Sequence, residues 1–228
     1  AIRQFSKKTK FYQASSSEMY GNSDSKFQDE RTHFKPISPY AISKLHAHWM
    51  LGLYRSAYNL YCCSGILFNH ESPLRGSEFV SKKIVSDLIK IKFNQLSCMY
   101  LGNIYAKRDW GYSLDYVEAM WKMLQQKNAD DYVISSGINK TVKSFVNEVA
   151  KNLEIKIKWI GKGLNEKAIN EKNKKVIIRI NKKLFRPIEI KSTYGNSSKA
   201  KKILKWSPRT DFRALVKIMC EKELEKYR

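Results

Sequence analysis

The chain has 228 residues, long enough to bury a sizeable core, and its 43 basic and 21 acidic side chains give a formal charge of +22. The lysines are spread along the chain and mixed with acidic residues, and no zinc-finger, RRM or helix-turn-helix signature accompanies them, which favours a lysine-rich surface over a nucleic-acid-binding protein. No apolar stretch approaches the ~20 residues that span a bilayer, and no signal-peptide core stands near residue 1, so the sequence predicts a cytoplasmic protein without a membrane partner.

Apolar runs separated by polar turns predict alternating strands and helices, and therefore an α/β fold. The expected strands cover residues 10–14, 61–68, 98–101, 131–135, 155–159 and 176–180. The expected helices cover residues 40–57, 79–91, 114–126, 141–153, 197–204 and 211–227. The run 61–68 is mainly apolar, as is typical of a strand that a parallel sheet buries on both faces.

The cysteines and histidines show no metal-site pattern. No CxxC spacing occurs, and two of the cysteines are adjacent within an apolar run, which predicts buried, reduced thiols. None of the histidines at positions 33, 46 and 48 stands in a carboxylate cluster or has the partner spacing of a metal site, so we expect no metal. The cysteines are Cys62, Cys63, Cys98 and Cys220.

Two short segments carry candidate chemistry. Tyr40 and Lys44 stand four residues apart in SPYAISKLHAHW, a spacing that puts both side chains on one face of a helix. A free phenol titrates at about 10, and a neighbouring ammonium favours its ionised form, so the pair is a candidate general base. Taken alone, the spacing favours a solvated helix face over a catalytic pair. Ser16 and Glu18 lie in KFYQASSSEMYG, which indicates a strand running into a polar turn at the carboxyl edge of a parallel sheet.

Five motifs occur in order: QASSSE, SPYAISK, NHESPLRG, LGNIYAKRDWG and FRPIE. With them the sequence resembles the GDP-mannose 4,6-dehydratase family of extended short-chain dehydrogenases/reductases, from about Phe11 to near its carboxyl terminus. The resemblance implies a partial NAD(P)-binding Rossmann fold with a smaller α/β substrate-binding lobe, built mainly from residues 72–101 and 153–228. The family's GxxGxxG turn, which holds a pyrophosphate at a helix amino terminus, has no counterpart here. We therefore expect residues 1–228 to form an incomplete Rossmann unit, the carboxyl-terminal portion of a dehydratase.

The resemblance also implies a reaction. A hydro-lyase of this family converts GDP-mannose to GDP-4-dehydro-6-deoxy-D-mannose by oxidation, loss of water and reduction, with NADP as a cofactor that is not consumed. Tyr40 would take the proton of the sugar C4 hydroxyl, Ser16 would share that hydrogen bond, and Lys44 would hold the nicotinamide ribose. Glu18 would remove the C5 proton. Serine at position 16 keeps the hydroxyl of the threonine that is usual in the family.

Further contacts follow from the matched motifs. Besides Tyr40 and Lys44, the cofactor would meet His70 and Arg75, and Leu74 replaces an arginine of the family's motif. Guanidinium forks and an ammonium suit a diphosphate, and a carboxylate suits a guanine edge or a ribose hydroxyl. The matched substrate positions are Asn69, Lys83, Arg108, Arg186 and Glu189.

Two alternatives remain open at the level of sequence. One keeps the fold but changes the sugar, as in another nucleotide-sugar dehydratase or an epimerase, although an epimerase needs no base at C5 such as Glu18. The other is a non-catalytic remnant that binds anionic partners through its charge. For the full-length protein we expect a homo-oligomer, a dimer or a tetramer, and no nucleic acid partner.

Overall fold

The structure is a computed structural model that describes residues 1–227, and the chain forms two compact units. Unit 1 contains Ala1–His70, Arg108–Asn139 and Ser192–Asp211. Unit 2 contains Glu71–Lys107, Lys140–Lys191 and the segment that begins at Phe212. Each unit is therefore assembled from segments that are distant in the sequence.

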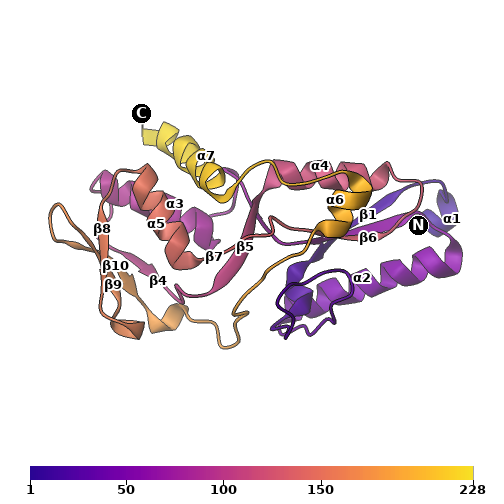
Figure 1. Ribbon diagram of the computed structural model, residues 1–228, viewed down its shortest axis with the longest axis horizontal. Coiled ribbons are helices and arrows are strands. Elements are labelled where there is room, and N and C mark those ends of the chain that lie inside the picture. The colour runs from indigo at the N-terminus through magenta and orange to yellow at the C-terminus, as the bar shows by residue number, and fades with distance from the viewer. Residues whose placement is uncertain (228) are drawn as a thin grey trace. The chain divides into compact units, whose positions relative to one another are not determined.

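Unit 1 is built on a parallel sheet with the strand order β1-β2-β6. Its strands are β1 (Phe11–Ser16), β2 (Cys62–Leu67) and β6 (Asp131–Ile134), and its helices are α1 (Ile2–Phe5), η1 (Ser17–Tyr20), α2 (Pro39–Tyr58), α4 (Ser113–Leu124) and α6 (Ser198–Leu204). Helix α2 covers one face of the sheet, and α4 and α6 cover the other (Figure 1). A parallel sheet with helices on both faces is the Rossmann-type α/β arrangement that the sequence predicted.

The core of unit 1 lies on both faces of the central strand. Every residue of β2 is buried. On the α2 face, Ile66 packs in a cluster with Met19, Leu45 and Phe68. The opposite face holds a larger cluster, which comprises Cys63, Leu67, Tyr116, Ala119, Met123, Tyr132, Ile134, Ala200, Leu204 and Trp206. A strand buried on both sides explains the apolar run in the sequence.

Unit 2 contains a four-stranded sheet with the order β4-β10-β9-β8. Its strands are β4 (Met99–Leu101), β8 (Ile157–Ile160), β9 (Lys167–Asn170) and β10 (Val176–Ile180), and its helices are α3 (Val80–Lys92), η2 (Gly163–Asn165), α5 (Val142–Asn152), η3 (Lys182–Leu184), α7 (Phe212–Leu224) and η4 (Glu225–Tyr227). Met99 and Ala168 flank Ile178 across the sheet, and all three are buried. Helices α3, α5 and α7 pack against one another.

A third sheet has the order β3-β5-β7, formed by β3 (Asn69–Glu71), β5 (Lys107–Tyr112) and β7 (Asn139–Thr141). Each of these strands contains a point where the chain leaves one unit for the other. None has an apolar run, so no local pattern predicted these strands.

The helices and strands expected from the sequence are confirmed, with ends that differ by up to three residues. Strand β1 continues to Ser16, because Ser15 and Ser16 pair with Ile66 and Leu67 of the buried neighbouring strand. Besides the third sheet, the prediction missed α1 and β9. Strand β9 has the sequence KAIN, and its place in the sheet depends on pairing with β8 and β10 rather than on local pattern.

Candidate active site

Ser16 and Glu18 stand at the carboxyl end of β1. Ser16 is the last residue of the strand and is buried, and its Oγ accepts a hydrogen bond from the backbone N–H of Glu18 at 3.2 Å. The turn closes at Gly21, whose φ is +56° and where a Cβ would come within 1.9 Å of the Lys35 carbonyl oxygen. This turn fixes Glu18 beside the strand end, and the Ser16 hydroxyl keeps its own proton to donate to a ligand.

Tyr40 and Lys44 come from the first two turns of α2. Ser38 caps the helix by accepting from the N–H of Ala41 at 3.1 Å, and Pro39 occupies the first helical position. The Lys44 Nζ donates to the carbonyl oxygen of Ala14 in β1 at 3.0 Å and lies 5.7 Å from the centre of the Tyr40 ring. Lys44 therefore joins the helix to the strand that carries Ser16, and Tyr40, 51% exposed, lies in the first turn at the sheet's carboxyl edge.

Asn69 and His70 follow the carboxyl end of β2. The His70 Nδ1 lies 2.9 Å from the carbonyl oxygen of Phe68, so this nitrogen carries a proton and donates it. The imidazole also stacks on the Tyr116 ring, with 5.0 Å between ring centres. Both contacts fix the orientation of the ring within unit 1.

Arg75 is held by its neighbours in unit 2. Its Nε lies 3.1 Å from the buried Glu71 carboxylate, and its guanidinium carbon lies 3.4 Å from the centre of the Phe79 ring. Burial raises the pKa of Glu71, while Arg75 and the Ser81 hydroxyl act in the opposite direction. The guanidinium is therefore oriented before any ligand arrives.

The loop that carries Arg75 is fixed by a buried ion pair. The Lys82 Nζ donates to the carbonyl oxygen of Pro73 at 2.9 Å and to the Glu223 carboxylate of α7 at 2.7 Å. The next residue, Lys83, pairs with Asp87 one helical turn away at 2.5 Å. Lys83 also lines a pocket of about 480 Å³ with Asp87, Lys90, Gln95, Leu96, Cys98, Met99 and Tyr100.

The remaining substrate positions fall in both units. Arg108 belongs to unit 1 and is half-buried in β5. Arg186 and Glu189 belong to unit 2, where Arg186 is exposed and the Glu189 carboxylate accepts from the Asn103 amide at 2.9 Å. That contact joins two matched motifs, LGN and FRPIE.

Asp109 is a buried residue whose role the sequence analysis missed. Its carboxylate accepts from the N–H groups of Ser136, Gly137 and Gly195 at 2.7, 3.0 and 3.2 Å, and from the Ser136 hydroxyl at 2.6 Å. Burial raises the pKa of Asp109 to about 6, although these hydrogen bonds oppose the shift. Its place beside Arg108 in the RDWG motif was the available signal.

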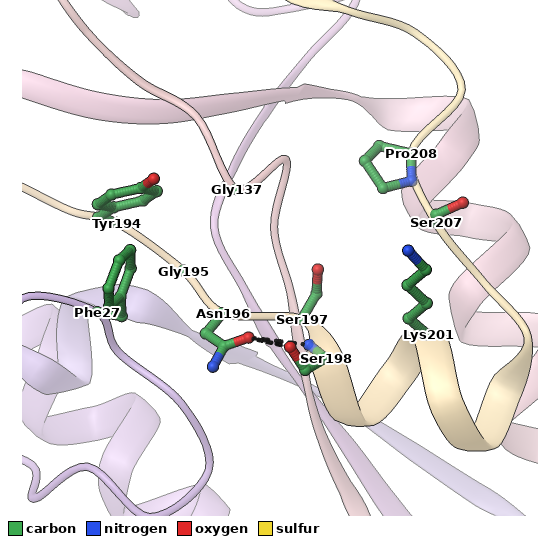
Figure 2. Close-up of a pocket in the computed structure, with 10 residues that line it drawn as sticks. All are labelled: Phe27, Gly137, Tyr194, Gly195, Asn196, Ser197, Ser198, Lys201, Ser207 and Pro208. Atoms are coloured by element: carbon green, nitrogen blue, oxygen red, sulfur yellow. Dashed lines mark hydrogen bonds between the residues drawn. The ribbon is translucent and has the colours of Figure 1, made fainter.

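A pocket of about 420 Å³ in unit 1 contains none of the predicted site residues. Phe27 and Tyr194 face each other at one end, and the Asn196 side chain accepts from the N–H and hydroxyl of Ser198 (Figure 2). Gly137 and Gly195, both held by Asp109, lie in its wall. Nothing else in this lining points to a particular ligand, and we assign none to the pocket.

Residues 1–227 contain neither a membrane-spanning helix nor a cluster of metal-binding side chains. No helix in this part of the chain is long and apolar enough to cross a membrane. Within the same residues, no group of three or more histidine, cysteine or acidic side chains is arranged to hold a metal ion.

Comparison with known sequences identifies close relatives. The sequence model of the GDP-mannose 4,6-dehydratase family matches residues 1–219. The GDP-mannose 4,6-dehydratase of Dictyostelium discoideum is 48% identical over 219 residues, which are 96% of this chain and 62% of that protein. The Homo sapiens protein of the same name is 45% identical over 216 residues, 95% of this chain and 58% of its own length. The chain thus spans less than two thirds of these relatives.

Comparison with solved structures identifies the fold. A dTDP-glucose 4,6-dehydratase from Bacillus anthracis, solved with NAD, matches 99% of this chain and 64% of its own with a TM-score of 0.80 at 20% identity. The protein RMD from Pseudomonas aeruginosa, solved with NADPH, matches 95% of this chain and 66% of its own with a TM-score of 0.79 at 17% identity. At these identities the likeness establishes the α/β Rossmann-type fold.

Proposed function

Because the chain belongs to the GDP-mannose 4,6-dehydratase family, we propose that it carries the catalytic residues of a hydro-lyase that dehydrates GDP-mannose to GDP-4-dehydro-6-deoxy-D-mannose. The observation that carries the proposal is the pairing of Lys44 with the backbone of β1, two residues before Ser16 and one helical turn from Tyr40. A hydroxyl, a carboxylate, a phenol and an ammonium thereby come from one strand end and one helix start.

The residues of unit 1 fit a nicotinamide cofactor. Tyr40 offers a half-exposed phenol, Lys44 an ammonium on the same helix face, and His70 an imidazole whose orientation is fixed by Phe68 and Tyr116. NAD and NADPH occur in the two structural neighbours named above, and we propose NADP for this chain. When bound, the nicotinamide supplies hydride chemistry, removing hydride from sugar C4 and returning it to C6.

The side chains of this chain would move the protons. Tyr40 takes the proton of the C4 hydroxyl, while the Ser16 hydroxyl, which already accepts from the Glu18 N–H, donates to the same oxygen. The resulting C4 carbonyl makes the C5 proton acidic, and Glu18 takes it as water leaves from C6. Glu18 lies in the turn directly after Ser16, so its carboxylate comes from the same strand end as the hydroxyl that acts at C4.

For the nucleotide part of the substrate, we propose Asn69 and Arg108 in unit 1 and Lys83, Arg186 and Glu189 in unit 2. The guanidinium groups suit the diphosphate, and Glu189 suits a hydroxyl or amine of the nucleoside. Unit 1 would then act as the cofactor-binding unit, and unit 2 would supply most of the substrate-binding residues. A homo-oligomer and a cytoplasmic location are part of the same proposal.

The experiment is Glu18→Gln in a protein that turns over GDP-mannose. The amide cannot take the C5 proton, so oxidation at C4 proceeds, reduced cofactor accumulates as absorbance near 340 nm, and C5 exchanges no deuterium from solvent. Glu221→Gln, on the exposed surface of α7, is the matched control and keeps normal turnover. Normal dehydration by the Glu18 variant would remove Glu18 from its role, and turnover of dTDP-glucose in preference to GDP-mannose would replace the substrate.

A further inference from the structure

A histidine beneath the candidate active site connects two strands. The His48 Nδ1 lies 3.0 Å from the Ser15 Oγ of β1 and 3.0 Å from the Ser64 Oγ of β2. Both serines are buried, and the Phe34 ring meets the imidazole edge-on at 5.3 Å between centres. His48 is therefore a polar contact between α2 and two neighbouring strands.

The hydrogen bonds continue to a charged pair at the start of β6. The Ser64 hydroxyl donates to the Asp131 carboxylate at 2.5 Å, and Arg55 binds the same carboxylate through both terminal nitrogens, at 2.5 and 3.3 Å. Burial alone would raise the pKa of Asp131, but the hydrogen bonds from Arg55 and Ser64 outweigh it and lower that pKa. Asp131 is thus an ionised acceptor.

These bonds determine which nitrogen of His48 carries a proton. Ser64 has one hydroxyl proton and gives it to Asp131, so towards His48 it can only accept. The Nδ1 must therefore be the donor, with its proton directed to the oxygens of Ser64 and Ser15. Burial lowers the pKa of His48, which favours the neutral ring.

We propose that His48 is a positioning residue that sets α2 against β1, and thereby sets Tyr40 and Lys44 relative to Ser16. Tyr40, Lys44 and His48 are spaced by four residues and share one helix face. Along that face Lys44 donates to the Ala14 carbonyl, and His48 binds the next side chain of the strand, Ser15. As a statement about catalysis, the inference rests on the proposed function.

This position of α2 requires a hydrogen-bond donor where the His48 Nδ1 lies, and a side chain of similar volume without a donor would not replace it. An apolar side chain would leave the buried Ser15 and Ser64 hydroxyls without this partner. Errors of about 1 Å in the placement of catalytic groups cost roughly a hundredfold in rate, so a small shift of α2 has a measurable effect on turnover.

The test compares His48→Asn with His48→Gln. The asparagine amide nitrogen reaches about as far as Nδ1 and can donate to the same serines, whereas the glutamine amide reaches the position of Nε2. The control is His46→Asn, at an exposed histidine of the same helix. In a protein that turns over GDP-mannose with NADP, we expect His48→Gln to lose roughly tenfold to hundredfold in kcat with little change in KM. His48→Asn should stay within about threefold, and the control should be unchanged.

A second measurement does not depend on turnover. Amide hydrogen exchange at Ser16, Glu18 and the first turn of α2 should accelerate about tenfold in His48→Gln, and not in His48→Asn or the control. Should His48→Gln fail to fold, Ser15→Ala, which removes the β1 partner, is expected to give the same local acceleration. Equal behaviour of the Asn and Gln variants in both measurements overturns the inference. Turnover of another nucleotide sugar in preference to GDP-mannose contradicts the proposed function, and the exchange pattern then decides the inference alone.

Discussion

The substitution Asp109→Asn tests whether a buried carboxylate organises the end of the unit 1 sheet. In the native protein the four donors divide evenly: Ser136 gives its N–H and hydroxyl to one carboxylate oxygen, and Gly137 and Gly195 give their N–H groups to the other. Asparagine has one oxygen and one NH₂ group. Two of the four hydrogen bonds must be lost, and the NH₂ group then faces donors.

The size of the effect follows from two opposing terms. The pKa of Asp109 is raised from 3.8 to about 6 with its hydrogen bonds included, so the charged carboxylate is less favourable in the folded protein than a neutral group by about 3 kcal/mol at pH 7, and asparagine removes that cost. Against this, the NH₂ group of asparagine leaves two buried donors unsatisfied, at about 1 to 3 kcal/mol each. The two terms are of similar size, and we expect Asp109→Asn to destabilise unit 1 by only about 1 kcal/mol at pH 7.

The sign of the pH dependence is a sharper check. Between pH 3.8 and 6 the folded protein holds the Asp109 proton and the unfolded chain does not, so the stability contributed by this group falls as pH rises through that window. Asparagine does not titrate. The deficit of the variant relative to wild type should therefore be about 1 kcal/mol larger at pH 5 than at pH 7.

Urea denaturation at pH 5 and pH 7 measures this difference, with the fluorescence of Trp110 and Trp206, both buried in unit 1, as the signal. Taking the difference between variant and wild type cancels the titration of other groups. The control is Asp24→Asn, since the exposed Asp24 pairs with Lys35, its pKa is lowered, and its contribution is constant between pH 5 and 7. A deficit that is equal at both pH values, or smaller at pH 5, would refute the account of Asp109.

Three further predictions concern binding and stability. Alanine at Arg108 or Arg186 should raise the Kd for GDP-mannose by roughly tenfold to a hundredfold, with partial rescue by lysine, as measured in substrate titrations; unchanged affinity would remove the residue from the diphosphate site. Lys82→Met should destabilise unit 2 by about 2 kcal/mol in urea denaturation because it removes the buried ammonium partner of Glu223 and leaves that carboxylate with Lys226 alone, whereas Lys222→Met, in an exposed pair, should cost less than about 1 kcal/mol. Calorimetric titration of the 228-residue chain with NADP(H) should show no submicromolar binding, since the sequence contains no GxxGxxG turn, and tight binding would show that the cofactor site is elsewhere.

The parts of the fold that the sequence predicted well are those that local rules determine. Strand β2 and helix α2 were found because an apolar run and a four-residue spacing are visible within a short window. Strands β3, β5 and β7 were not found, because each contains only three to six residues of mostly polar character and is ordered by partners far along the chain. Pairing between distant segments leaves no periodic signal.

The same distinction applies to the candidate site. The sequence identified side chains whose chemistry is visible from their type, such as Glu18 and Lys44, but it could not show that Arg75 lies on the Phe79 ring or that Lys82 ties the preceding loop to α7. Asp109 directly follows Arg108 in the RDWG motif. Its role depends on donors from residues 136, 137 and 195, which only the folded chain brings together.

The four-residue spacing on α2 extends one turn beyond Tyr40 and Lys44 to His48, and the topology of the sheet explains why the third residue differs in role. Between two parallel strands the connecting helix runs antiparallel to them, so its first turn lies at their carboxyl edge and each later turn lies deeper. Tyr40 in the first turn is half-exposed at that edge, Lys44 in the second reaches back to the Ala14 carbonyl, and His48 in the third meets the buried Ser15. Residues at one four-residue spacing therefore include both the candidate base Tyr40 at the sheet edge and His48, which binds α2 to β1. A sequence motif that ends at Lys44 stops one helical turn before His48, the residue that we propose holds the helix in place.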